Sequence, residues 1–459
     1  MDESILERLK KNSADGRLPM HMPGHKRNPQ FEHLTPLGGT LDITEIDGFD
    51  DLNSPDGIFL ESERLAASLW GSSECLYSVN GSSGAILAGV RAVVKDGGRL
   101  LMARGCHKSV YHAAELTGAS AVYFEAELTS YGFLSGISPD EVEKKLSEYP
   151  DTKLVIITSP TYEGVISDVR SIADVCHRYN VPLMVDEAHG AHLGLHGIFP
   201  DGAVKCGADI VVQSIHKTLP SLTQTALLHL SGDLVSPLEV KRQMAMFQTS
   251  SPSYLLSSSI DGAVRFLASA EGKKCLRQWH DAVLQTHERL RSLQNTGVFH
   301  AEDGAFDVDP SKFVLRGGAV LAELLRKNNV EPEMVSKYYT VAMTGAGDTA
   351  TSLEAFASAV EAADRYNGSA DVIVNTSRHH LPEVKTTIAE AVFLPRELCR
   401  GYDAVDRISA GYVYAYPPGI PLCVPGEIID HRTVDEVMSL IDAGLDLRGL
   451  ENGCFAVVK

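Results

Sequence analysis

The chain segment that decides the fold lies between residues 181 and 218 and contains VPLMVDEAHGAH at 181–192 and ADIVVQSIHKT at 208–218. Each piece begins as a short apolar run and ends in polar residues, which is typical of a buried strand that reaches the edge of a sheet. The apolar runs RLLMAR, AVYFEA and KLVIITSP precede it, and the helical pattern IADVCHRYN separates the last of these from VPLMVDEA. Short apolar runs that alternate with helical patterns predict βαβ units and a mostly parallel sheet, hence an α/β fold.

The sequence predicts three parts. Residues 1–60 open with a short amphipathic helix and continue as a Gly- and Pro-punctuated arm, which holds too few large apolar residues for a core of its own. Residues 61–295 form the large domain and end in a long helical stretch from Lys273 to Leu293. Residues 296–459 form a smaller α+β domain, in which VFLP and ISAGYVYAY are expected strands and PPGIPLCVPGE is an expected loop.

Composition excludes several classes of protein. The 459 residues are 44% hydrophobic and 22% charged, which is ordinary globular usage, and the net charge of −19 disfavours binding to a phosphate backbone. None of the 8 cysteines forms a C-x-x-C pair, the N-terminus lacks the apolar core of a signal peptide, and no apolar run reaches membrane-spanning length. We therefore expect a cytoplasmic protein that binds neither nucleic acid nor membrane.

Two ionisable residues follow predicted strands. Lys217 comes directly after the run ADIVVQ, and Asp186 ends the run VPLMV, 31 residues earlier. Ligands of open α/β sheets bind beyond the carboxyl ends of the strands, so both side chains are expected to face one pocket. A pyridoxal phosphate site needs such a pair, a lysine for the aldehyde and a carboxylate for the pyridinium nitrogen. The alternatives are a lysine with its amine in water, and an aspartate that caps a helix or forms a salt bridge.

Two further turns support a phosphate-bearing ligand. The turn Asn80-Gly81-Ser82-Ser83-Gly84 follows a strand and opens a helix, where backbone N–H groups favour an anion, although such turns are also common helix caps. His107 ends another strand and is a candidate for stacking on a flat ring, or simply a capping residue. Asp186 to His189 spell DEAH, but the chain has no phosphate loop of the nucleotide-driven motors. The histidines that follow lack H-E-x-x-H spacing, so we expect no metal.

The motifs together resemble one known family. MHMPGHKR, DITEIDGFDDLNSPDG, NGSSGA, GCHKS, SPTYEG, VDEAHGAH, SIHKTLPSLTQTA, TSSPSYLLSSSID and AYPPGIPLCVPGE occur in one order across about residues 19 to 430. This set closely resembles the ornithine/lysine/arginine decarboxylases in their short bacterial form. The resemblance implies a fold-type I, aspartate aminotransferase-like large domain that binds pyridoxal 5'-phosphate, with a smaller C-terminal domain.

The resemblance also implies roles for individual residues. Lys217 is expected to form the covalent link to the cofactor, Asp186 to bind the ring nitrogen and His107 to stack on the ring. His216 is expected to border the phosphate and to share with Lys217 the return of a proton to the α-carbon. The remaining cofactor-binding residues are predicted to be Ser82, Ser83, Gly84, His189, Ser214, Thr249 and Ser250. Thr249 and Ser250 are expected to reach the cofactor of a neighbouring subunit, because such sites lie at a dimer interface.

The predicted reaction is the loss of the α-carboxylate from a basic L-amino acid, with arginine or lysine favoured and ornithine as a further candidate. The amine product would feed polyamine biosynthesis, and the protein is expected to be a homodimer or a higher homo-oligomer. The first alternative is an aminotransferase or another fold-type I lyase, which would share Lys217 and Asp186. A second alternative is a catalytically silent relative that binds a partner or regulates, against which the retained lysine, aspartate and His107 argue.

Overall fold

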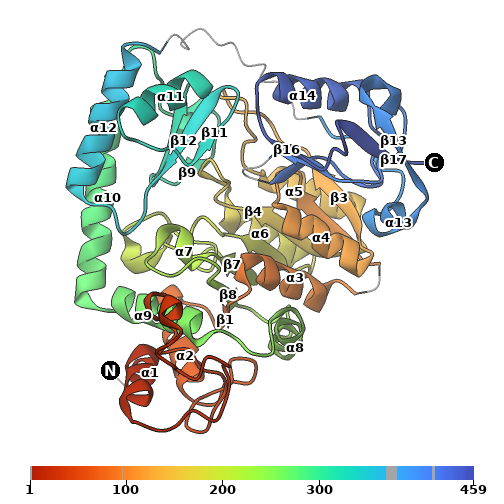
Figure 1. The fold of residues 1–459 in the computed structure, drawn as a ribbon. Coiled ribbons are helices and arrows are strands. Elements are labelled where there is room, and N and C mark those ends of the chain that lie inside the picture. The colour runs from red at the N-terminus through yellow and green to blue at the C-terminus, as the bar shows by residue number, and fades with distance from the viewer. Residues whose placement is uncertain (1–2, 96, 368–379, 416–418) are drawn as a thin grey trace. The chain divides into compact units, whose positions relative to one another are not determined.

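The computed structural model describes residues 3–95, 97–367, 380–415 and 419–459. The chain forms two compact units, each built from two separate stretches (Figure 1). The first unit comprises Met1–Ala92 and Glu187–Arg277, and the second comprises Val93–Asp186 and Gln278–Lys459. The domain boundaries expected from the sequence, near residues 60 and 295, stay predictions.

The first unit contains three strands in the order β1-β8-β7, with both pairings antiparallel. Gln213 at the end of β7 pairs with Leu227 of β8, and Tyr77 of β1 pairs with the same Leu227 from the other side. The elements of this unit are α1 (Ile5–Ala14), η1 (Glu32–Leu37), α2 (Ile58–Trp70), β1 (Glu74–Ser78), α3 (Gly81–Val93), η2 (Leu195–Gly197), β7 (Ile210–Gln213), α7 (Ile215–Thr218), β8 (Ala226–Leu230), α8 (Pro237–Phe247), α9 (Tyr254–Ala268) and the start of α10 (Ala270–Leu290).

Helix α1 of the N-terminal arm packs its apolar face into the unit. Ser4 caps it with a reciprocal capping box to Glu7, and Ile5 and Leu9 on the inner face are fully or almost fully buried. The backbone N–H of Ile5 donates to the buried carboxylate of Asp261 on α9 at 2.9 Å. The predicted amphipathic helix is therefore confirmed, and the contacts of α1 with α9 fix its place.

The second unit contains four parallel strands in the order β6-β4-β2-β3. Leu154 to Ile157 of β4 are completely buried, as expected for a parallel strand that is covered on both faces. Helix α6 begins at an Asp168 side chain that accepts the Ser171 N–H at 3.1 Å. The elements are β2 (Arg99–Ala103), α4 (Lys108–Thr117), β3 (Ser120–Phe124), α5 (Pro139–Glu148), β4 (Thr152–Thr158), β5 (Val165–Ile166), α6 (Val169–Arg178) and β6 (Leu183–Asp186).

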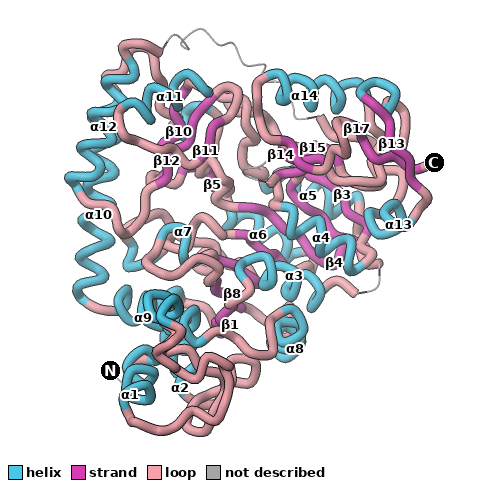
Figure 2. The backbone as a smooth tube through the Cα atoms, viewed as in Figure 1, coloured by secondary structure: helices cyan, strands magenta, loops and turns pink. Residues whose placement is uncertain are grey.

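The later stretch of the second unit adds small antiparallel sheets with helices (Figure 2). The aromatic rings of Tyr131 and Phe133, from the earlier stretch, share one core cluster with Phe299 and Val314 from the later stretch. The elements are η3 (Ala301–Asp303), β9 (Asp307–Val308), β10 (Lys312–Arg316), α11 (Ala319–Lys327), β11 (Met334–Val335), β12 (Tyr339–Met343), α12 (Ala350–Asp364), α13 (Ile388–Phe393), β13 (Arg396–Arg400), η5 (Gly401–Ala404), β14 (Val413–Ala415), β15 (Ile420–Cys423), α14 (His431–Asp442), β16 (Leu447–Arg448) and β17 (Cys454–Val458).

Two local expectations for this stretch need correction, and strand β8 of the first unit has no counterpart among the predicted strands. VFLP is not a strand, because Val392 and Phe393 end helix α13, which a Thr387 capping box begins. The expected loop PPGIPLCVPGE contains strand β15, which pairs with β14; Tyr416 of the expected strand and Pro417 and Pro418 of the loop lie outside the described residues. Among the residues that the structure describes, no helix combines the length and the apolar character that crossing a bilayer requires.

Candidate active site

The first unit places Lys217 in a helical turn directly after strand β7. Gln213 ends the strand and the next residue, Ser214, is the N-cap residue of α7, so the chain turns at once and carries Lys217 half-buried on the new helix. The Nζ atom of Lys217 lies 2.9 Å from Nε2 of His189, which is 6% exposed. While the lysine amine is charged it only donates, and Nε2 of His189 is then the acceptor. The lysine amine is therefore held by an imidazole, unlike one that extends into water.

His216 is oriented by the strand that follows. Its Nδ1 donates to the backbone oxygen of Thr225 at 2.8 Å, which leaves Nε2 as a proton acceptor. Burial lowers the pKa of His216, and the neighbouring Lys217 charge lowers it further, while the hydrogen bond to Thr225 opposes both effects. His216 is therefore neutral near pH 7 and able to take up a proton.

The turn before α3 is joined to the same region by residues that the sequence did not single out. The side-chain amide of Gln224 donates to the Val79 backbone oxygen at 2.6 Å, and the Gln248 side chain accepts the Val79 N–H at 3.0 Å. Gln224 and Thr225 are adjacent, so one short segment holds both this turn and His216. The polar run TQT directly before the apolar strand ALLHL was the available signal.

Small residues shape the start of α3. Gly81 has a φ of +72°, which favours glycine, and a Cβ on Gly84 would lie 3.0 Å from Asn80 Cβ. Ser82 is half-buried and Ser83 is exposed. The first backbone N–H groups of a helix lack intrahelical partners, so this end of α3 offers donors to an anion.

Thr249 and Ser250 lie on the surface between α8 and α9. Both are exposed, and the backbone oxygen of Thr249 accepts a hydrogen bond from the side chain of Asn53 at 3.2 Å. Their position in the first unit agrees with neither a buried core role nor a direct hydrogen bond to Lys217. Their expected role toward a second subunit stays a prediction.

The second unit holds Asp186 and His107. Asp186 is 2% exposed at the end of β6, where its backbone oxygen accepts the Ser159 N–H at 3.1 Å and its register partner is Thr158 of β4. Burial raises the pKa of Cys106 to about 12, and the nearby Asp186 carboxylate adds to that rise. The carboxylate therefore lies close to the residue that precedes His107.

His107 is the N-cap residue of α4. Its Nδ1 lies 2.8 Å from Ser109 Oγ and accepts the Ser109 backbone N–H at 3.3 Å. The capping role, which the sequence left open as an alternative, is thus present, and it fixes the direction of the ring. The cap uses only Nδ1, so the half-buried ring is still able to stack on a ligand.

Arg104, just before this segment, is held by a buried carboxylate. Its guanidinium lies 3.2 Å from Glu427, and the two side chains are 3% and 1% exposed. Arg104 also donates to Tyr111 Oη at 2.7 Å and to the Leu422 backbone oxygen at 3.3 Å. The Glu427 carboxylate raises the pKa of Arg104 against the effect of its burial. Glu427 in the VPGE loop is therefore engaged by an internal cation.

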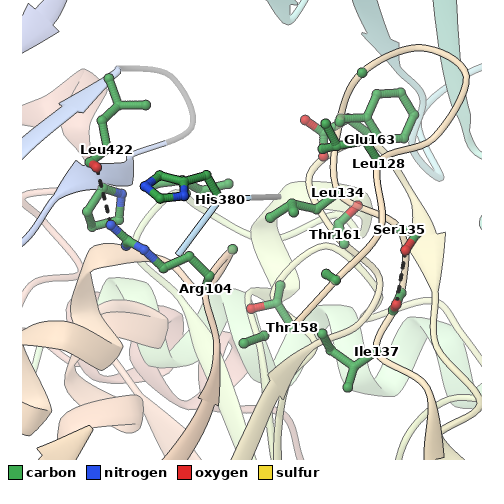
Figure 3. Close-up of a pocket in the computed structure, with 18 of the residues that line it drawn as sticks. Arg104, Leu128, Leu134, Ser135, Ile137, Thr158, Thr161, Glu163, His380 and Leu422 are labelled. Carbon is green, nitrogen blue, oxygen red and sulfur yellow. Dashed lines mark hydrogen bonds between the residues drawn. The ribbon is translucent and has the colours of Figure 1, made fainter. Parts of the chain in front are cut away.

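A cavity of about 220 Å³ opens at the carboxyl edge of the parallel strands of this unit (Figure 3). Thr158 at the end of β4 and Gly105 after β2 line its base, and the apolar side chains of Leu128, Phe133 and Ile137 line its walls. Because Thr158 is the register partner of Asp186, the cavity begins beside the predicted position of the cofactor ring. This is the edge at which open α/β sheets bind ligands.

The comparisons with known proteins agree with this architecture. Residues 5–315 match the major domain of the Orn/Lys/Arg decarboxylases, and residues 379–446 match their C-terminal domain. An arginine decarboxylase of Bacillus subtilis is 32% identical over 98% of this chain and 96% of its own length. The structure of the lysine decarboxylase LdcF from Francisella novicida covers 99% of this chain and 80% of its own, with a TM-score of 0.83 at 18% identity. A structure titled SPT with PLP covers 68% of this chain and 77% of its own, with a TM-score of 0.54.

The likeness to these structures confirms the predicted fold class, a fold-type I large domain with a mostly parallel sheet and a smaller C-terminal domain. The chain belongs to the Orn/Lys/Arg decarboxylase family and is therefore a carboxy-lyase of basic amino acids.

The residues of the first unit fit the cofactor that this family implies. Ser214 is completely buried, and its hydroxyl has no hydrogen-bond partner among the residues that the structure describes. A buried hydroxyl without a partner is costly unless a ligand satisfies it, and a phosphate oxygen would do so. The lysine amine beside His189 offers the nucleophile that an aldehyde requires.

Proposed function

We propose that this protein removes the α-carboxylate of L-arginine, with L-lysine as the second substrate and L-ornithine as a weaker one. The geometric observation that carries the proposal is the Lys217 amine, held 2.9 Å from His189 in the turn that also contains the unsatisfied Ser214 hydroxyl. The preference for arginine rests on the names of the relatives that match nearly the whole chain.

Each predicted residue has a distinct task toward the cofactor. Lys217 would hold the aldehyde covalently, Asp186 would keep a proton on the ring nitrogen, and His107 would cover one face of the ring. The phosphate would be held from the first unit by Ser82, Ser83, Gly84 and Ser214. When bound, pyridoxal phosphate supplies an electron sink for the bond that breaks at the α-carbon.

The protein residues then control protons and orientation. His216 is neutral near pH 7 because burial lowers its pKa, and its Nε2 is then able to act as a proton acceptor. Delivery of a proton to the α-carbon by Lys217 or His216 would complete the formation of the amine. The bond that breaks is selected by the orientation of the substrate, which the cavity walls restrict.

The test measures products with three substrates. Purified protein is incubated with arginine, lysine and ornithine, and carbon dioxide and the amine are quantified, with borohydride-sensitive absorbance near about 420 nm as a record of the lysine-bound cofactor. Lys217→Ala is expected to abolish both signals, whereas Lys241→Ala, at an exposed lysine paired with Glu74, is expected to leave both unchanged. A keto acid in place of an amine would indicate an aminotransferase, and absence of both signals from the unaltered protein would indicate a silent relative.

We also propose that the protein works in the cytoplasm as a homodimer or higher homo-oligomer, and that its amine product is a precursor of polyamines. The exposed positions of Thr249 and Ser250 support the homo-oligomer, because surface residues are able to contact a neighbouring subunit. Light scattering after size exclusion measures the mass directly. A mass of one chain for the fully active enzyme would contradict the homo-oligomer.

A further inference from the structure

The cavity of the second unit contains one buried carboxylate. Glu163 is 7% exposed and lines the cavity above Thr161, which in turn lies above Thr158 at the strand end (Figure 3). Two other ionisable residues of the lining are already engaged, since Arg104 is paired with Glu427 and His380 with Asp430. The fourth, Glu436, has an exposed side chain overall, although burial of its carboxyl raises its pKa and the charges of Arg104 and His380 oppose that rise. Glu163 is therefore the lining carboxylate that is buried and that faces neither of these two cations.

The described surroundings of Glu163 donate hydrogen bonds but contribute little compensating charge. The hydroxyl of Tyr339 donates to Glu163 Oε1 at 2.8 Å, and Thr161 supplies a second hydroxyl donor. Burial raises the pKa of Glu163, and these donors and the more distant Lys312 ammonium oppose that rise. No residue in the described part of the chain forms an ion pair with Glu163 within 4.0 Å. A carboxylate has about four lone-pair sites, so capacity remains for a further N–H donor.

We infer that Glu163 binds the distal cation of the substrate, with a guanidinium as the preferred group. The inference rests on the proposed function and deepens it. Leu128 and Leu134 lie between the strand end and Glu163 and offer apolar surface to the methylene groups of the substrate (Figure 3). Phe133 also lines the cavity. A planar guanidinium matches a carboxylate with two parallel N–H donors, whereas an ammonium meets it as a point charge.

The experiment compares arginine with citrulline, which replaces the guanidinium by a neutral urea of nearly the same shape. In Glu163→Gln the KM for arginine is expected to rise at least about 100-fold with kcat changed less than about threefold, because a buried charge pair loses one partner. The ratio of kcat/KM for arginine to that for citrulline is expected to collapse by a similar factor. If Glu163 had a purely structural role, its replacement would lower kcat/KM for arginine and for citrulline by the same factor.

Glu333→Gln is the matched control. Its carboxylate also accepts a tyrosine hydroxyl, that of Tyr162, but it is exposed and does not line the cavity. This variant is expected to keep the arginine KM and the discrimination against citrulline. Calorimetric titration of each holoenzyme with agmatine gives a readout independent of turnover, and the Glu163 variant is expected to bind it at least about 30-fold more weakly.

A second variant keeps the inference testable if Glu163→Gln does not fold. Tyr339→Phe retains the ring and removes one donor to Glu163, so the arginine KM is expected to rise about threefold to tenfold while citrulline is unaffected. An arginine KM within twofold of the unaltered enzyme in Glu163→Gln, or in Tyr339→Phe where only that variant folds, overturns the inference and leaves decarboxylation standing. Unaltered protein that yields no amine from any basic amino acid overturns the proposed function instead.

Discussion

Replacing Glu427 by glutamine tests the buried ion pair of the second unit. The N–O distance of 3.2 Å corresponds to an attraction of about 5 kcal/mol at an effective dielectric constant of about 20. The glutamine oxygen still accepts the Val424 N–H, which Glu427 holds at 2.9 Å, so the loss is mainly that of a charge. Arg104 then stays buried against the neutral oxygens of Tyr111 and Leu422 and the ring of Tyr123, without its ion-pair partner. We expect the free energy of unfolding to fall by about 3 to 5 kcal/mol.

Urea denaturation measures this loss against two references. Glu331→Gln breaks the exposed pair with Arg326, at 2.8 Å, and is expected to cost about 0 to 1 kcal/mol. The double variant Arg104→Met/Glu427→Leu removes both charges and is expected to be more stable than either single variant, since no uncompensated charge remains. A loss below about 1 kcal/mol in Glu427→Gln, or additive losses in the double variant, would refute the electrostatic reasoning.

Three further outcomes follow from features of the first unit. Burial raises the pKa of Glu63 to about 8, so between about pH 5 and 8 the folded state keeps a proton that the unfolded chain releases. The free energy of unfolding should therefore fall as pH rises through this range. Glu63→Gln should flatten this slope in urea titrations. Ser214→Ala should weaken pyridoxal phosphate binding about tenfold in equilibrium dialysis, and an unchanged affinity would remove this hydroxyl from the phosphate site. Leu9→Ala should cost about 2 to 4 kcal/mol and expose the arm to protease, since Leu9 is 1% exposed.

The parallel part of the fold was predictable because its strands are read from local apolar runs. LVII at 154–157 is completely buried in β4, and VVQ ends β7 directly before the lysine turn. The expectation for VFLP was wrong because a cap on Thr387, five residues upstream, recruits Val392 and Phe393 into a helix. Strand β15 was missed because its pairing with β14, rather than its Pro-rich sequence, defines it.

The sequence predicted the chemistry of the candidate site, but not the residues whose hydrogen bonds hold the site in place. Lys217 and Asp186 stand out because charged residues rarely follow buried strands without a task. Gln248 and Gln224 have no such mark, and their hydrogen bonds to Val79 span 169 and 145 residues. Contacts over such separations depend on the tertiary fold, so a single sequence does not reveal them. Glu163 lay within the recognised SPTYEG motif, but only the cavity gave it a role.

The interleaving of the two units has a consequence for synthesis. The ribosome completes 1–92 and 187–277 before it has made 278–459, so every piece of the first unit is available while the second still lacks its later stretch. At about 5 to 20 residues per second, the remaining roughly 180 residues take about 10 to 40 seconds to appear. Tyr131 and Phe133 of the nascent chain have no Phe299 to pack against until residue 299 is made, 166 residues after Phe133 and about 8 to 33 seconds later at that rate. The growing polypeptide should therefore recruit chaperones in this window, and ribosome profiling of chaperone-bound chains would reveal their release once residue 299 has left the exit tunnel.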